Sequence, residues 1–169
     1  MVDKPPKSDY HKWEVIPNRK RWTMKLSTKG RYGLRAMLDL GLNAGGTHVA
    51  LSHIADRQNL SVRYLEQMFS ALRKAGLVNS VKGAQGGYTL ARTPDRIPVG
   101  SILRALEGDL SIIDDKAETD GNHYEACIRK NVWDRLNESI NAIVDSLTLQ
   151  DLMDEYQQMD ATQSFIYYI

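Results

Sequence analysis

Polar side chains that can bind nucleic acid are concentrated in a segment that begins at residue 61. Serine and tyrosine hydroxyls can donate hydrogen bonds to phosphate, whereas arginine and glutamine can recognise base edges. The segment contributes Ser61, Arg63, Tyr64, Glu66 and Gln67. Glu66 is the exception, because phosphate repels a carboxylate, which is useful mainly as an acceptor for a cytosine amine. Glu66 therefore has two interpretations, a specificity filter facing the bases or an ion pair with Arg63.

Two further clusters can contact phosphate. One surrounds the start of a predicted helix, whose N-terminus attracts anions, and consists of Lys25, Ser27, Thr28, Lys29 and Arg31. The other lies in a turn over residues 82–87, where three glycines let the backbone approach a minor groove closely. Its candidate contacts are Lys82, Gln85 and Gly86.

The periodicity of apolar residues places these clusters on a definite order of elements. Helical spacing predicts helices over residues 28–43 and 61–75, with a shorter helix over 52–58 capped by Ser52. The period then falls towards two in residues 77–81 and 88–91, which predicts a β-hairpin around the glycine-rich turn. This order is typical of a winged helix-turn-helix, whose third helix enters the major groove. The predicted fold class is mainly α with a small β-hairpin wing.

The remainder of the chain is predicted to be helical. A helix opens at Pro98 and ends at Gly108, and an acidic loop follows. A long helix over residues 128–146 carries an apolar stripe of Val132, Leu136, Ile140, Ile143 and Leu147. Thr148 and Asp151 resemble a capping box for a short final helix, followed by a β-favouring tail over residues 164–169. We divide the chain into a flexible extension or tag (1–23), a winged helix-turn-helix domain (24–107), a loop (108–127) and a long helix with its tail (128–169).

The net charge of +1 conceals a strong asymmetry. Residues 24–92 hold ten Lys and Arg against three Asp and Glu, whereas residues 93–169 hold six against fifteen. A basic half followed by an acidic half indicates a polyanion-binding module and a part that stays away from the polyanion. The alternative is two solvated faces whose compositions differ by chance.

Other classes of protein find little support in the composition. The single cysteine, Cys127, excludes an internal disulfide framework and fits a reducing cytoplasm. No apolar run is long enough to span a bilayer, and no signal-peptide pattern opens the chain. The four histidines are scattered, and no phosphate loop, zinc motif or paired nucleophile and base is present, so we expect no enzyme.

Four sequence motifs resemble the Rrf2 family of bacterial transcription regulators. They occupy residues 24–33, 64–67, 72–78 and 83–88. The resemblance implies a homodimer that binds a palindromic operator in double-stranded DNA, with the long helix as the dimerisation element. It also implies that Ser61, Tyr64, Glu66 and Gln67 belong to the recognition helix and that Lys82 stands at a basic wing position.

Within the family, the cysteine content separates two expectations. Iron–sulfur members carry three cysteines before the long helix, and Cys127 stands where the third would be. Stepping back by six residues gives Gly121 and Asp115, and one thiolate cannot hold a cluster. We therefore expect no cofactor, with a cluster-based or redox sensor of nitric oxide or cluster biogenesis as the alternative.

The other branch of the family resembles a cysteine-metabolism repressor, and its aromatic C-terminal end is similar to residues 165–169. The resemblance implies control of sulfur genes and a partnership with O-acetylserine thiol-lyase, captured through Tyr168 and the carboxylate of Ile169. The alternative is that this tail packs on the dimer body.

Overall fold

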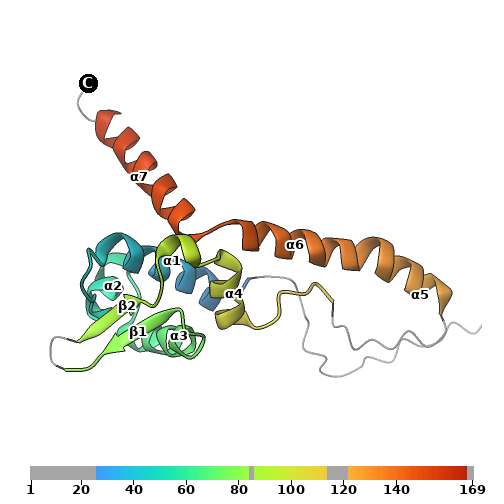
Figure 1. Ribbon diagram of the computed structural model, residues 1–169, viewed down its shortest axis with the longest axis horizontal. Helices are drawn as coiled ribbons and strands as arrows, with labels where there is room; N and C mark the ends of the chain where they lie inside the picture. The colour runs from blue at the N-terminus through green and yellow to red at the C-terminus, as the bar shows by residue number, and fades with distance from the viewer. Residues whose placement is uncertain (1–25, 84–85, 114–121, 167–169) are drawn as a thin grey trace, which may run out of the picture.

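The computed structural model describes residues 26–83, 86–113 and 122–166, with side chains through Thr162. Its N-terminal half contains α1 (Thr28–Asn43), α2 (Leu51–Gln58) and α3 (Val62–Lys74), followed by strands β1 (Val78–Val81) and β2 (Gly87–Leu90). Figure 1 shows the three helices gathered beside the antiparallel hairpin. The predicted winged helix-turn-helix is therefore confirmed.

Local capping explains where these helices begin and end. The hydroxyl of Ser61 accepts a hydrogen bond from the amide of Tyr64 at 3.2 Å, as an N-cap should. The predicted cap Ser52 is wrong, because α2 begins at Leu51 after Ala50, which makes no side-chain cap bond. The tight turn of the motif is made by Asn59, which adopts the left-handed conformation at φ 52°.

One apolar core holds the three helices, the hairpin and the next helix together. α1 and α3 supply its centre, and Ile97, which follows η1 (Pro94–Arg96), closes it together with α4 (Val99–Glu107). Its largest fully buried side chains include Met37, Leu40, Ile54, Leu65, Met68, Phe69, Leu72, Ile97 and Ile102. Burying a side chain of this size contributes roughly 1.5–3 kcal/mol, so the core fixes the direction in which α3 points.

The wing is anchored to the helices by a third extended segment. Val49 and Tyr88 exchange two backbone hydrogen bonds of 2.9 Å. Gly87 permits this approach, because a Cβ there would lie 2.5 Å from the Val49 carbonyl oxygen. The ring of Phe69 packs edge-on against Tyr88, with centroids 4.8 Å apart. The hairpin therefore cannot shift independently of α3.

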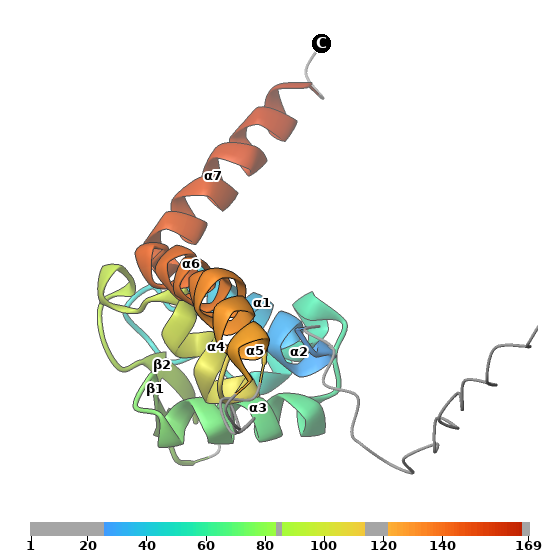
Figure 2. The ribbon, with the colours of Figure 1, turned by 90° about the vertical axis from the view of Figure 1, so that its right-hand side faces the viewer.

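The C-terminal helices leave the domain in two directions (Figures 1 and 2). The first direction is taken by α5 (His123–Ile128), a π-helical turn η2 (Arg129–Trp133) and α6 (Asp134–Ser146). The helix thus starts at His123, not at Ile128 as predicted, because Asn122 caps it by accepting from the amides of Tyr124 and Glu125. The loop predicted over residues 108–127 therefore ends before His123.

The last helix also corrects a prediction. α7 runs over Leu149–Ile166 and is long rather than short, so residues 164–166 are helical despite their β-favouring composition. The predicted capping box is confirmed, since Asp151 Oδ2 accepts from the Thr148 amide at 2.8 Å. Once a helix is nucleated, each further residue adds one hydrogen bond, which outweighs weak local preferences. Among the described residues, no helix has both the length and the apolar character needed to cross a membrane.

Candidate nucleic-acid interface

The outer face of α3 presents the predicted recognition residues. Because Leu65, Met68 and Phe69 are buried, the helix turns the opposite face outwards. That face exposes Ser61, Arg63, Glu66 and Gln67, and leaves Tyr64 half-buried. The structure therefore brings together all five recognition residues that the sequence predicted, although the Ser61 hydroxyl also serves as the helix cap.

Glu66 forms no ion pair with Arg63 or with any other residue in the described part of the chain. The ion-pair interpretation is therefore not realised in the structure. An exposed carboxylate on a DNA-facing helix lowers affinity through repulsion and can raise selectivity. The specificity-filter interpretation is the one that remains a prediction.

Behind α3, a polar network positions the turn of the motif. Asp39 of α1 is only 4% exposed, and its carboxylate accepts from Arg57 Nη2 at 2.5 Å and from Gln58 Nε2 at 2.7 Å. Arg35 binds the Gln58 side-chain oxygen at 3.0 Å. The hydrogen bond that Arg57 donates to Asp39 raises the pKa of Arg57 above its usual value.

The same network reaches Tyr64. The Arg35 guanidinium lies over the ring of Tyr32, 5.4 Å from its centroid, and Tyr32 meets the ring of Tyr64 edge-on at 6.3 Å. α1 therefore fixes both the turn before the recognition helix and a side chain on it. Sequence reasoning missed this network, although one signal existed: Asp39 interrupts an otherwise apolar stretch of α1.

The wing offers one exposed cation. Lys82 follows β1 and is exposed, and Arg73 of α3 donates to the Ser80 hydroxyl at 3.2 Å, which ties β1 to the recognition helix. Gly86 lies where a Cβ would come 2.3 Å from the Val81 carbonyl oxygen, so the turn requires glycine there. Gln85, the other predicted wing contact, lies outside the described residues.

The N-terminus of α1 differs from the phosphate site that the sequence suggested. The Ser27 hydroxyl caps the helix by accepting from the amides of Lys29 and Gly30, and it donates to Glu107 Oε1 at 2.5 Å. A carboxylate of α4 therefore occupies the position beside the cap where phosphate was expected. Thr28 and Arg31 are exposed nearby, whereas Lys25 lies outside the described residues.

The apolar stripe predicted along the long helix is largely exposed. Val132, Leu136 and Leu147 are exposed, Ile143 is 60% exposed, and Ile140 is half-buried. The neighbouring face of α6 is held to α4, because Arg104 binds Asp145 at 2.7 and 2.8 Å. The hydrogen bond from Arg104 lowers the pKa of Asp145. One face of α6 therefore contacts α4, and another face is apolar and largely exposed.

Cys127 is exposed on α5, where the Asn131 amide nitrogen lies 3.6 Å from its sulfur. Within residues 26–83, 86–113 and 122–166, no three His, Cys, Asp or Glu side chains gather as metal ligands would. Gly121 and Asp115, the two positions at cysteine spacing, lie outside the described residues, as do Tyr168 and Ile169.

Comparison with known proteins places this arrangement in a family. The Rrf2 family profile, described as an iron-dependent transcriptional regulator, matches residues 26–155. The regulator CymR of Bacillus subtilis is 43% identical over 76% of this chain and 89% of its own length. The regulator IscR of Aliivibrio salmonicida is 40% identical over 83% of this chain and 85% of its own length.

Solved structures agree with the sequence comparison. The structure of B. subtilis CymR, described as the global cysteine regulator of that organism, superimposes with a TM-score of 0.67. It is 42% identical and covers 78% of this chain and 97% of its own. The relatives named here are HTH-type transcriptional regulators and not enzymes. The chain therefore belongs to the Rrf2 family and is a DNA-binding transcription regulator with a winged helix-turn-helix fold.

Proposed function

We propose that two copies of this chain form a homodimeric repressor that binds a palindromic operator. The observation that carries this proposal is the apolar stripe along η2 and α6, which the described residues leave largely exposed beside a packed helix-turn-helix domain. A two-fold axis that passes through that stripe perpendicular to α6 would present two copies of α3 to one face of a duplex. Two half-sites one helical turn apart, about 34–36 Å, would then match the dimer.

In this proposal α3 reads the major groove and the wing contacts the backbone. Arg63 and Gln67 can donate to base edges, and the exposed Glu66 rejects sequences that offer it no amine donor. Tyr64 and Lys82 bind phosphate oxygens and so fix the register of the helix. The fixed positions of Asp39, Arg57 and Arg35 behind α3 support this assignment of roles.

Analytical ultracentrifugation combined with DNase I footprinting tests the proposal. We expect a dimeric mass and protection of two half-sites, both lost in the variant L136D/I143D. The matched control A142D adds an aspartate to an exposed position off the stripe and should stay dimeric. A monomeric wild-type protein, or a monomer that protects both half-sites, would contradict the proposal.

We propose control of sulfur and cysteine metabolism genes as the biological role. The similarity to CymR over 89% of that protein supports it, as does the presence of one cysteine in place of three. Footprinting on promoters of sulfur genes and of iron–sulfur biogenesis genes separates this role from the alternative. Protection of the second set alone would contradict it.

We further propose that the signal arrives without a bound cluster, since Cys127 supplies one thiolate per chain. The alternative, a cluster-based or redox sensor, is favoured by the similarity to IscR. The visible spectrum of anaerobically purified protein decides between them. Charge-transfer absorbance that disappears in a C127S variant would establish the alternative.

The partner that we propose is an O-acetylserine thiol-lyase that captures the C-terminal residues Tyr168 and Ile169. Capture of a terminal carboxylate by backbone amides is a common mode of peptide recognition, and α7, the last helix, extends away from the three helices and the hairpin of the DNA-binding domain (Figure 1). Pull-down with the full chain should fail when Ile169 is deleted. Retention of the enzyme by the deleted chain would remove this partner.

A further inference from the structure

An open pocket lies under the segment that connects β2 to α4. Its volume is about 620 Å³, and it is lined by Ala91, Arg92, Thr93, Asp95 and Arg96. The turn η1, which forms one wall, contacts α7. In both ribbon views the turn η1 lies on the side of the domain opposite α3 (Figures 1 and 2). The pocket is therefore separate from the surface that presents the recognition residues.

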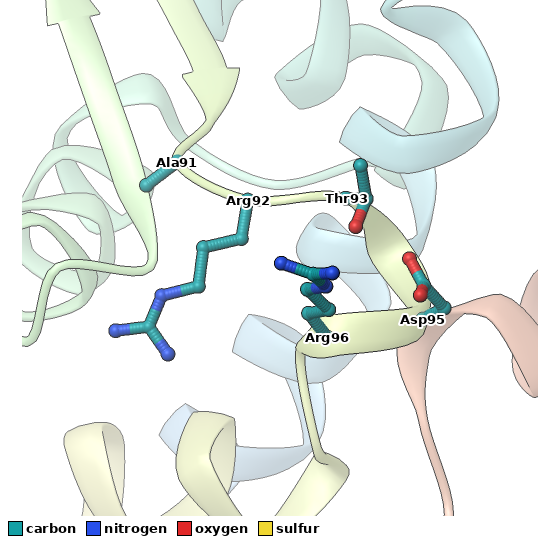
Figure 3. Close-up of a pocket in the computed structure, with 5 residues that line it drawn as sticks. All are labelled: Ala91, Arg92, Thr93, Asp95 and Arg96. Atoms are coloured by element: carbon teal, nitrogen blue, oxygen red, sulfur yellow. The ribbon is translucent and has the colours of Figure 1, made fainter.

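Two guanidinium groups project into this pocket. Figure 3 shows Arg92 and Arg96 extending into the same open space. Both side chains are exposed, and neither forms a hydrogen bond or ion pair with a described residue, Asp95 included. Arg57 and Arg104, by contrast, are each held by a carboxylate. Asp95 lines the same pocket but pairs with neither guanidinium, so the two arginines repel each other, and an oxyanion between them would reduce this cost.

We infer that this pocket binds a small, hydroxylated oxyanion that carries at least two negative charges. The planar fork of each guanidinium matches a carboxylate or phosphate group with two parallel hydrogen bonds. Arg92 and Arg96 therefore suit two such groups on one ligand.

The other lining residues narrow the class of ligand. The Thr93 hydroxyl can donate or accept, and the Asp95 carboxylate can only accept, so it repels a bare ion but favours a ligand hydroxyl. The pocket volume falls in the range of small-molecule sites, roughly 300–1,000 Å³. Hydroxylated di- and tricarboxylates and sugar bisphosphates meet these requirements, whereas sulfate, which carries no hydroxyl at neutral pH, does not use Asp95.

Isothermal titration of the full chain at low ionic strength tests the site, with citrate as the probe and sulfate as the bare-ion comparison, which we expect to bind more weakly than citrate. We expect citrate to bind the wild type and to bind R92Q/R96Q at least about tenfold more weakly. The matched control R135Q removes an exposed arginine of α6 and should bind citrate as the wild type does. Absence of citrate binding to the wild type, or equal binding to all three proteins, overturns the inference.

A DNA backbone carries the same phosphate chemistry, so a second arm of the experiment separates the two sources. The salt dependence of binding to a 40-base-pair duplex of random sequence is measured without citrate. We expect the same slope for the wild type and R92Q/R96Q, because the pocket lies away from α3. A slope lower by about two units in the variant would assign both arginines to DNA phosphates and overturn a small-molecule site.

Discussion

The helix-turn-helix half (α1 to α4) and the C-terminal arm (α5 and α6) are both largely helical, but the first buries its apolar residues and the second exposes them. From α1 to α4 the stripes close on one another, and Phe69, Leu65 and Leu40 are fully buried. Along α5 and α6 a stripe of equal regularity remains exposed, with Ile143 at 60%. The first region buries its apolar face within one chain, whereas no residue that the structure describes covers the apolar face of the second.

This difference indicates which part of the chain is stable by itself and which part needs a second copy. A stripe of exposed apolar side chains over four helical turns is costly in water, at about 25 cal/mol per Å² of surface. The chain maintains that stripe while it ties the adjacent face of α6 to α4 through Arg104 and Asp145. The comparison supports the proposal that a second copy of the chain covers the apolar stripe that remains exposed in the first.

The sharpest test of the comparison replaces one apolar residue in each region. We expect F69A to lower the free energy of unfolding by about 3–5 kcal/mol, because a fully buried aromatic side chain is removed. I143A should have a small effect on the isolated chain, since its side chain is mainly exposed. Urea denaturation at several protein concentrations measures both.

The concentration dependence is the control. Association stabilises the folded state by mass action, so the effect of I143A should grow as protein concentration rises, whereas that of F69A should not. If I143A were as damaging as F69A at the lowest concentration, the contrast between the two regions would be lost.

The second test compares the two ion pairs, one in each region. D39A leaves Arg57 without its partner, which costs about 3–5 kcal/mol when both groups are buried. Because the Arg57 side chain is 39% exposed, we expect a loss of roughly 2 kcal/mol after solvent screening. D145A should cost less, since both partners of that pair are exposed. Chemical denaturation gives both values, and the reverse ranking would be evidence against the network as the support of α3.

The third test compares the effect on DNA binding of removing one positive charge from each region. K82A should weaken binding to a duplex of random sequence and lower the salt slope by about one unit, because one phosphate contact is lost. R135A, which removes a cation from the C-terminal arm, should leave the slope unchanged. Fluorescence anisotropy over a salt series measures both, and equal slopes for K82A and the wild type would argue against wing–phosphate contact.

The smallest effect is expected from pH. The hydrogen bond from Arg104 lowers the pKa of Asp145 below its ordinary value of 3.8, so the folded state favours the charged carboxylate. This contribution is fully present above pH 3.8 and disappears as pH falls through the lowered pKa. The stability difference between wild type and R104Q should therefore be constant from pH 7 to pH 5 and shrink below pH 4. A difference that grows on acidification would reverse the assigned sign.

The sequence predicted the elements whose signals are local. Helical spacing placed α3, whose N-cap is Ser61, and the glycine-rich turn placed the hairpin. The early start at His123 was missed because the preceding residues are acidic and polar, and the cap at Asn122 does not interrupt an apolar pattern.

Contacts between distant residues were beyond sequence reasoning. The Ser27–Glu107 bond joins residues 80 positions apart, and nothing near either residue indicates the other. The Asp39 network likewise depends on how α2 crosses α1. The exposed face of α3 was predictable because it follows from burial of the opposite face, whereas the pocket at Arg92 and Arg96 depends on how η1 folds back.

An isolated antiparallel bridge between Pro98 and Thr148 joins the start of α4 to the segment between α6 and α7. On one side of it the Val99 amide bonds to the Leu147 carbonyl at 2.8 Å, and on the other the Leu149 amide bonds to the Ile97 carbonyl at 2.9 Å. The rod from His123 to Ser146 extends about 36 Å from this point. A tilt of about 5° over that length moves its far end by roughly 3 Å, close to the 3.4 Å rise of one base pair. In the proposed dimer, a change of this size in the angle between α6 and the DNA-binding domain would therefore change the spacing of the two half-sites by about one base pair.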